Sequence, residues 1–169
     1  YWCQVEQYQL DNEGQWKQRA SESSGPVTLA VRVADSKLSV EKMEDKMNIS
    51  AAEDFTIPCN INQRTSDESQ FQITWFWQKD AETEPQSLFT AYRNSTFNSR
   101  HENVRFHHPL PHQFTLTVLT PGLKKSGLYF CEVEEWLHSL TQGWRKAAVT
   151  KSGNLNVTVH AGGSVKTLT

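Results

Sequence analysis

The sequence predicts an all-β fold in which two antiparallel sheets pack face to face around a disulfide. Cys59 and Cys131 lie far apart with Trp75 between them, which suits a bridge across a core with an indole packed on its sulfurs. Tyr129 stands two residues before the second cysteine, where its hydroxyl can cap the corner preceding that strand. Short runs of alternating apolar residues between turn residues complete the pattern.

The chain also repeats itself with an offset of 128 residues. The surroundings of Cys3 recur around Cys131, including a tyrosine two positions before the cysteine and a tryptophan 13 positions after it. A repeat of this period is the size of a domain. We therefore expect residues 1–34 to be the last two strands of a truncated domain, 35–160 a complete domain, and 161–169 a linker to the next module. Cys59 and Cys131 then pair with each other, and Cys3 with a partner outside this chain.

Alternation and turn residues predict the individual strands. In the truncated domain, residues 1–10 and 26–33 are predicted strands, and we expect them to be poorly packed because two strands alone are marginally stable. The complete domain shows no helical periodicity. Its predicted strands are residues 55–59, 71–77, 87–92, 104–106, 114–118, 128–133 and 155–159.

These features indicate an immunoglobulin fold, and the separation of the two cysteines resembles that of variable-type (V-type) domains, which have two additional strands. V-type domains usually have an aspartate six residues before the second cysteine, paired with an arginine. Here that position is Lys125 and the arginine is Arg105, so this ion pair cannot form. We expect Tyr129 and packing to hold the corner instead, because exposed ion pairs contribute little.

Strand alternation separates the core from an outer face. We expect outward side chains of the two central strands to form an exposed face, joined by Leu88 or Phe89 from the adjacent strand. The candidate interface residues are Phe76, Gln78, Phe89, Phe130 and Glu132. Clustered solvent-facing aromatics usually mark contacts. The alternative is that the long hairpin after Cys131 covers them.

That hairpin carries the triplet Glu135-Trp136-Leu137 and, further on, Trp144. The pattern resembles the Glu-Trp-Ile (EWI) group of immunoglobulin-superfamily membrane proteins, with the member unresolved. The resemblance implies a single-pass type I cell-surface glycoprotein that associates laterally with other membrane proteins, typically tetraspanins, and modulates signalling. Because aromatics recur at these offsets in both copies, we expect Glu135, Trp136 and Trp144 to be hairpin scaffold.

Charge and sequons suggest the environment. A net charge of −2 and a pI near 6.3 give no electrostatic case for nucleic acid or an anionic membrane surface. The sequons at Asn48, Asn94 and Asn156, together with the cysteines, predict a secretory route and an extracellular location. The chain itself has no signal peptide and no apolar run long enough to span a bilayer. A glycan on Asn156 would reduce the area available for binding on any surface around Phe130.

The chemistry-bearing residues do not predict catalysis. His107, His108 and His112 fall in a proline-broken connection without a nearby thiolate, which indicates a solvated loop and not a zinc site. No nucleophile elbow, phosphate loop or His-Glu-x-x-His motif is present, so we expect no enzyme, cofactor or small-molecule substrate. We expect an adhesion or receptor segment. The alternatives are a structural spacer, or a secreted antigen-receptor-like chain, which the missing Phe/Trp-Gly-x-Gly segment disfavours.

Overall fold

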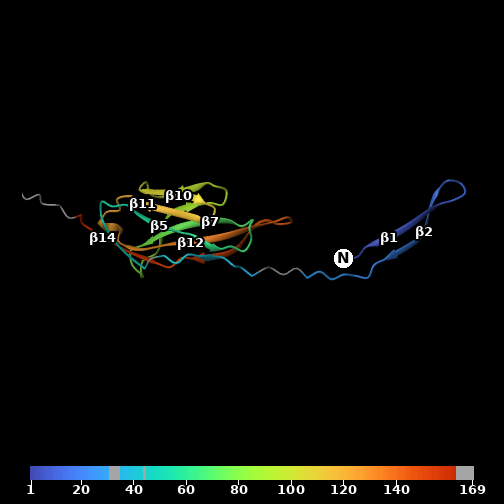
Figure 1. The fold of residues 1–169 in the computed structure, drawn as a ribbon, viewed down its shortest axis with the longest axis horizontal. Helices are drawn as coiled ribbons and strands as arrows, with labels where there is room; N and C mark the ends of the chain where they lie inside the picture. The colour runs from blue at the N-terminus through green and yellow to red at the C-terminus, as the bar shows by residue number, and fades with distance from the viewer. Residues whose placement is uncertain (31–34, 44, 163–169) are drawn as a thin grey trace, which may run out of the picture. The chain divides into compact units, whose positions relative to one another are not determined.

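The computed structural model describes three stretches of the chain, residues 1–30, 35–43 and 45–162. The chain divides into two compact units, a hairpin unit (Tyr1–Ala34) and a sandwich domain (Asp35–Thr169) (Figure 1). Residues 161–162 of the predicted linker have no regular structure, and residues 163–169 lie outside the described residues.

The hairpin unit consists of β1 (Gln4–Leu10) and β2 (Trp16–Ser23). Asp11 shapes the turn between them, because its Oδ1 accepts two backbone N–H groups of the turn, both at 2.9 Å. The prediction of a strand over residues 26–33 is wrong for residues 26–30, which have no regular secondary structure. Residues 31–33 lie outside the described residues. Among the described residues of this unit only Asp11 is partly buried, as expected for two strands that form no core of their own.

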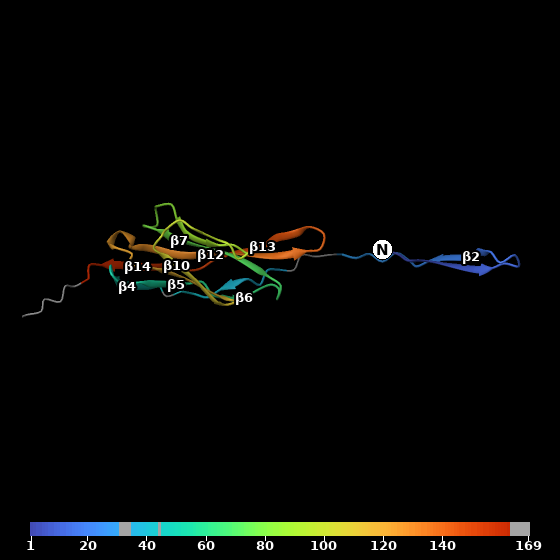
Figure 2. The ribbon, with the colours of Figure 1, turned by 90° about the horizontal axis from the view of Figure 1, so that it is seen from above.

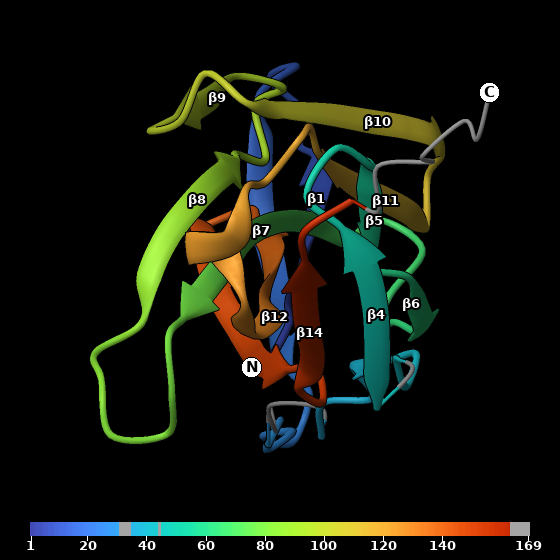
Figure 3. The same ribbon diagram turned by 90° about the vertical axis from the view of Figure 1, so that its left-hand side faces the viewer.

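The described residues of the sandwich domain are all-β apart from one 3-10 turn, η1 (Leu123–Lys125), so the predicted fold class is confirmed (Figure 3). The larger sheet has the order β4 (Lys46–Ser50), β14 (Leu155–His160), β12 (Gly127–Ser139), β7 (Gln70–Gln78), β8 (Gln86–Ala91) and β9 (Phe97–Ser99), with β13 (Gly143–Lys151) paired to β12. The opposing layer has the order β10 (Val104–Leu110), β11 (Gln113–Val118) and β5 (Phe55–Pro58). A separate two-stranded pair joins β3 (Ser39–Val40) and β6 (Ile61–Gln63).

A disulfide between Cys59 and Cys131 staples the core, as predicted. Trp75 of β7 is the direct strand partner of Cys131 and is fully buried. Its Nε1 donates to the carbonyl oxygen of Ile57 at 3.1 Å. Because Ile57 belongs to β5 in the opposing layer, the indole joins the two layers by a hydrogen bond as well as by packing.

Tyr129 holds the corner that precedes β12. Its hydroxyl donates to the carbonyl oxygen of Lys125 at 2.6 Å, and burial raises the pKa of Tyr129, so the phenol remains a protonated donor. The ammonium of Lys125 lies 4.3 Å from the ring centroid of Trp77. Neither Lys125 nor Arg105 forms an ion pair with another described residue, so the corner depends on Tyr129 and packing.

Replacing Cys131 with serine tests the staple. Loss of a native disulfide typically lowers stability by about 2–5 kcal/mol, so Cys131→Ser should abolish secretion or strongly lower the melting temperature. Thermal denaturation of the secreted chain measures the effect. Cys3→Ser, which changes only the exposed free thiol of the hairpin unit, is the control and should leave the melting temperature unchanged. Identical melting curves for Cys131→Ser and the unmodified chain would contradict this role.

Candidate functional site

The outer face of the larger sheet carries the aromatic pair that strand alternation predicts. Phe76 and Phe130 are direct partners on β7 and β12, and their rings stack with centroids 5.1 Å apart. Phe130 is nevertheless only 3% exposed. The ammonium of Lys151, on β13, lies 3.6 Å from the centroid of the Phe130 ring. The domain's own hairpin therefore helps to cover this pair, as the alternative interpretation holds.

Two other candidate interface residues lie on the same face and are half-buried. Gln78 donates from Nε2 to the carbonyl oxygen of Thr83 at 2.6 Å, which braces the turn between β7 and β8. Glu132 is the direct β13 partner of Lys151, so opposite charges face each other across this pair of strands. The Gln78 side chain therefore supports the local structure, and both residues leave only part of their surface for other contacts.

The prediction that Phe89 lies on the outer face is wrong. Phe89 is only 4% exposed, stacks on Phe106 with ring centroids 5.1 Å apart and meets Trp75 edge-on. A β-bulge explains the difference, because the register shifts between Trp75 and Phe76 and leaves Leu88 as the extra residue of β8. Leu88 is buried too, so neither residue extends the outer face.

The first residue of the Glu135-Trp136-Leu137 triplet is a buried anchor. Glu135 is fully buried, and its carboxylate accepts hydrogen bonds from the N–H of Thr65 at 2.6 Å, the Thr65 hydroxyl at 2.7 Å and the Ser69 hydroxyl at 2.6 Å. Both donor residues, Thr65 and Ser69, belong to the loop between β6 and β7, so the carboxylate fastens this loop to β12. These charge-assisted bonds offset the hydration that the carboxylate loses on burial.

The hairpin tryptophans form a cation–aromatic cluster on the outer face. The guanidinium carbon of Arg93 lies 5.5 Å from the ring centroid of Trp136 and 4.7 Å from that of Trp144. Trp136 also donates from Nε1 to Glu134 at 3.1 Å, and Glu134 pairs with Lys146 at 2.8 Å. Both indoles thus make contacts within the domain, and these contacts hold the hairpin against the turn that carries Arg93.

The hairpin unit reproduces this local geometry. The Tyr8 hydroxyl donates to Glu6 at 2.8 Å, at the positions equivalent to Trp136 and Glu134. The pairing of the two strands shifts register at equivalent positions in both hairpins, between Gln7 and Tyr8 and between Glu135 and Trp136. In both, the cysteine N–H donates to a serine hydroxyl across the hairpin, at 3.0 Å and 2.9 Å. The sequence repeat is therefore a repeat of local structure.

The end of the β12–β13 hairpin projects beyond the rest of the larger sheet (Figure 2). β12 pairs with β7 as far as Trp136, and after that residue its only partner is β13 among the described strands. Leu140 at the tip is 99% exposed, and Val149 on β13 is 49% exposed. These apolar side chains are the part of the hairpin most available to a partner.

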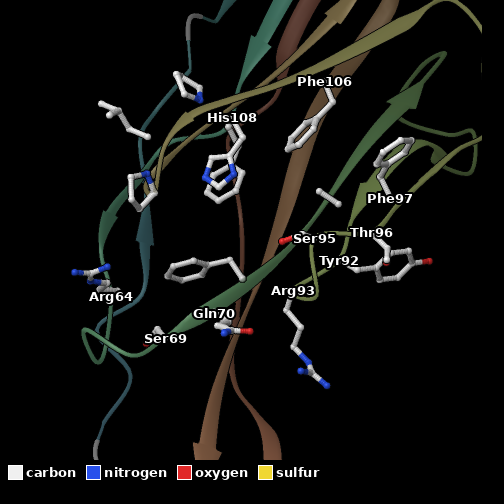
Figure 4. Close-up of a pocket in the computed structure, with 16 residues that line it drawn as sticks. Arg64, Ser69, Gln70, Tyr92, Arg93, Ser95, Thr96, Phe97, Phe106 and His108 are labelled. Atoms are coloured by element: carbon white, nitrogen blue, oxygen red, sulfur yellow. The ribbon is translucent and has the colours of Figure 1, made fainter.

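A hollow of about 520 Å³ opens between the sheets beside β10 (Figure 4). Phe106 and His108 of β10 line it together with Phe97 of β9, and the His108 ring stacks on Phe114 with centroids 4.1 Å apart. The side of the hollow formed by β9 and β10 is therefore aromatic, while the rest of its lining is mixed. Arg93 contributes to its rim, and Figure 4 shows the end of that side chain pointing away from the aromatic wall.

Two of the three histidines lie on a strand and not in the loop predicted for them, although both are exposed to solvent as predicted. His107 and His108 belong to β10, which continues through Pro109 to Leu110, and only His112 lies in the turn that follows. The strand tolerates proline because β10 is at the edge of its sheet. The described residues contain no group of three or more His, Cys, Asp or Glu side chains that could hold a metal ion.

All three sequon asparagines are exposed. Asn48 on β4 and Asn156 on β14 belong to two strands that pair in parallel. Asn156 is the direct partner of Leu128, two residues before Phe130, so it lies on the same face as Phe130. Asn94 lies in the turn between β8 and β9, beside Arg93.

Comparison with known proteins identifies the class. Residues 42–165 match the family model of the immunoglobulin V-set domain, and the chain belongs to this family. A solved structure titled as a marsupial T cell receptor has a TM-score of 0.59 and 14% identity, covering 81% of this chain and 60% of that chain. A structure of murine CRIg has a TM-score of 0.54 and 11% identity, covering 75% and 99%. These structures share the fold.

Curated relatives confirm the EWI resemblance, with the member unresolved. Immunoglobulin superfamily member 3 of Xenopus laevis is 27% identical over 94% of this chain, and immunoglobulin superfamily member 2 of Homo sapiens is 29% identical over 90%. The prostaglandin F2 receptor negative regulator of Rattus norvegicus is 23% identical over 94%. The chain spans only 15%, 16% and 18% of these relatives, respectively. No helix in the described residues is long and apolar enough to cross a membrane.

Substitution of Glu135 tests the buried anchor. Glu135→Ala removes the acceptor of the buried Ser69 hydroxyl and of the half-buried Thr65 groups, and should lower the free energy of unfolding by about 2–4 kcal/mol. Glu135→Gln retains one acceptor oxygen and should lower it less. Urea denaturation measures both values. Glu132→Ala on the outer face of the same strand is the matched control, with an expected change below about 1 kcal/mol. Equal losses at the two positions would show that Glu135 is no anchor.

Proposed function

We propose that this chain is an extracellular interaction segment of a single-pass cell-surface protein of the immunoglobulin superfamily, and that it acts by protein–protein contact. The V-set fold, the disulfide and the exposed sequon asparagines support this proposal. The names of the relatives support it as well, since one is a negative regulator of a receptor. A role in modulating cell-surface signalling follows by analogy with that relative.

The observation that carries the proposal is the projecting β12–β13 hairpin. It presents Leu140 to solvent at its tip and Val149 at its base, where Glu135 and the cluster of Arg93 and the two tryptophans fix the hairpin. A fixed base and an exposed leucine at the tip suit lateral contact with another membrane protein, and tetraspanins are the partners we propose. Binding energy at interfaces usually concentrates in a few such anchoring side chains.

A non-catalytic role agrees with the chemistry of the domain. The fully buried carboxylate of Glu135 is engaged by three hydrogen bonds from neighbouring residues. The sandwich cysteines form a disulfide, and the free thiol of Cys3 is exposed in the hairpin unit. These arrangements support structural roles for Glu135, Cys59 and Cys131.

A structural spacer is the second candidate function, and the burial of Phe130 favours it. Lys151 and Phe76 cover this ring, so the centre of the outer face offers less apolar surface than alternation alone suggests. If the domain is a spacer, neither the outer face nor the hairpin tip binds a partner. The two functions therefore differ in what substitution of the tip does.

Substitution of the tip distinguishes them. The complete chain is displayed on cells and cross-linked, and the recovered membrane proteins, tetraspanins included, are quantified. Leu140→Asp should reduce recovery of the partner by about tenfold, which corresponds to about 1.4 kcal/mol. Leu123→Asp, in η1 before β12, is the matched control because this leucine is also exposed, at 56%. Equal recovery from both variants would favour the spacer.

A further inference from the structure

The turn that carries Asn94 combines an attachment site for a sugar with a surface suited to hold one. We propose that Asn94 carries an N-linked glycan whose first N-acetylglucosamine packs on the surface formed by Trp136, Tyr92 and Arg93. The glycan is thus a fixed part of the outer face and not a freely moving chain. This inference rests on the extracellular location in the proposed function, but it does not depend on any contact of the hairpin tip with a partner.

The turn presents the reactive atom of Asn94. Its Oδ1 accepts the N–H of Thr96 at 3.1 Å and the Thr96 hydroxyl at 2.6 Å. The described residues provide no hydrogen-bond partner for Nδ2, and the side chain is exposed. The hydrogen bonds to Oδ1 therefore fix the orientation of the side-chain amide and leave Nδ2 for the sugar.

Attachment uses a polyprenyl-pyrophosphate-linked oligosaccharide as the donor. A bond forms between Nδ2 and C1 of the first N-acetylglucosamine, while the bond from C1 to the pyrophosphate oxygen breaks. The electron pair of that bond leaves with the lipid pyrophosphate, and Nδ2 gives up one proton. The product is an uncharged amide, so the turn gains bulk without charge.

The surface beside the turn has the chemistry that a sugar requires. A hollow of about 410 Å³ is lined by Gln72, Tyr92, Arg93, Asn94, Thr96 and Trp136. Tyr92 is 38% exposed and Trp136 is half-buried. An aromatic ring can receive the C–H face of a pyranose, while amide, guanidinium and hydroxyl groups can bond its polar rim. The lining of this hollow contains no carboxylate.

Covalent attachment favours occupancy of this hollow. Asn94 is itself one of the lining residues, so a sugar on Nδ2 is held at the rim. Tethering makes packing an intramolecular step, which does not require high intrinsic affinity. Arg93 is already fixed by its contacts with Trp136 and Trp144, so the surface is ordered before the sugar arrives.

The other two sequons provide internal controls. Asn48 and Asn156 are exposed on strands β4 and β14, and neither lines any of the three hollows described for the domain. A glycan on either residue should extend into solvent. Asn94 therefore has a hollow beside it in which a sugar can pack, whereas Asn48 and Asn156 of the same chain line none of the described hollows.

The test compares full-length chains that carry one glycan each. Asn48→Gln/Asn156→Gln carries a glycan only at Asn94, and Asn48→Gln/Asn94→Asp only at Asn156. Both are produced in cells that make high-mannose glycans and are trimmed by endoglycosidase H to a single N-acetylglucosamine. The sugar-free reference is Asn48→Gln/Asn94→Asp/Asn156→Gln, in which the aspartate keeps an acceptor oxygen for Thr96.

The Asn94-linked sugar should raise the melting temperature by about 2–4 °C over the reference. Its acetyl methyl proton resonance should move upfield under the ring current of Trp136. The Asn156-linked sugar should show neither effect, and Trp136→Leu should remove both from the Asn94 chain. Absence of a glycan on Asn94 by mass spectrometry would overturn the proposal. So would an unshifted acetyl resonance in the Asn94 chain, a result that does not require any tryptophan variant to fold.

Discussion

The arrangement of the sandwich domain depends on the two-residue alternation of one long strand, β12. Its inward side chains cap the corner, close the disulfide, fill the core and fasten the loop before β7; they are Tyr129, Cys131, Val133 and Glu135. Its outward side chains build the outer face; they are Phe130, Glu132, Glu134 and Trp136. A register slip of one residue would exchange the two sets. The continuous pairing of β12 with β7 from Leu128 to Trp136 therefore fixes the core and the surface together.

The two hairpins show which part of this arrangement is local. The hairpin unit keeps the register shift and the bond from an aromatic side chain to Glu6, although nearly all its described side chains are exposed. These features therefore do not require a sandwich core. The buried anchor differs, because the position of Glu135 is occupied by Gln7 in the first copy. A neutral amide cannot accept the same set of charge-assisted bonds. The recurring features shape the hairpin, and the anchor is particular to the second copy.

The sequence predicted features that follow from strand period and missed those that follow from packing. The shared outward face of Phe76 and Phe130 follows directly from alternation. The core position of Phe89 depends on a bulge at Leu88, for which alternation gives no signal. The cover that Lys151 provides to Phe130 comes from a long, flexible side chain on another strand. The resemblance singled out Glu135, but its bonds to Thr65 and Ser69 join residues about 70 positions apart, which periodicity cannot reveal.

The edge of the larger sheet limits how a partner can engage the hairpin. β13 pairs only with β12 among the described strands, and although β3 lies close to it, its outer backbone edge has no strand partner. It carries Arg145, Lys146 and Lys151 and contains a register shift, features that disfavour the addition of another strand. Side chains at the tip, and not backbone pairing, are therefore the available means of contact. A projecting two-stranded tip is weakly stable alone, so the bonds of Glu135 and the contacts of Arg93 at its base determine where Leu140 is presented.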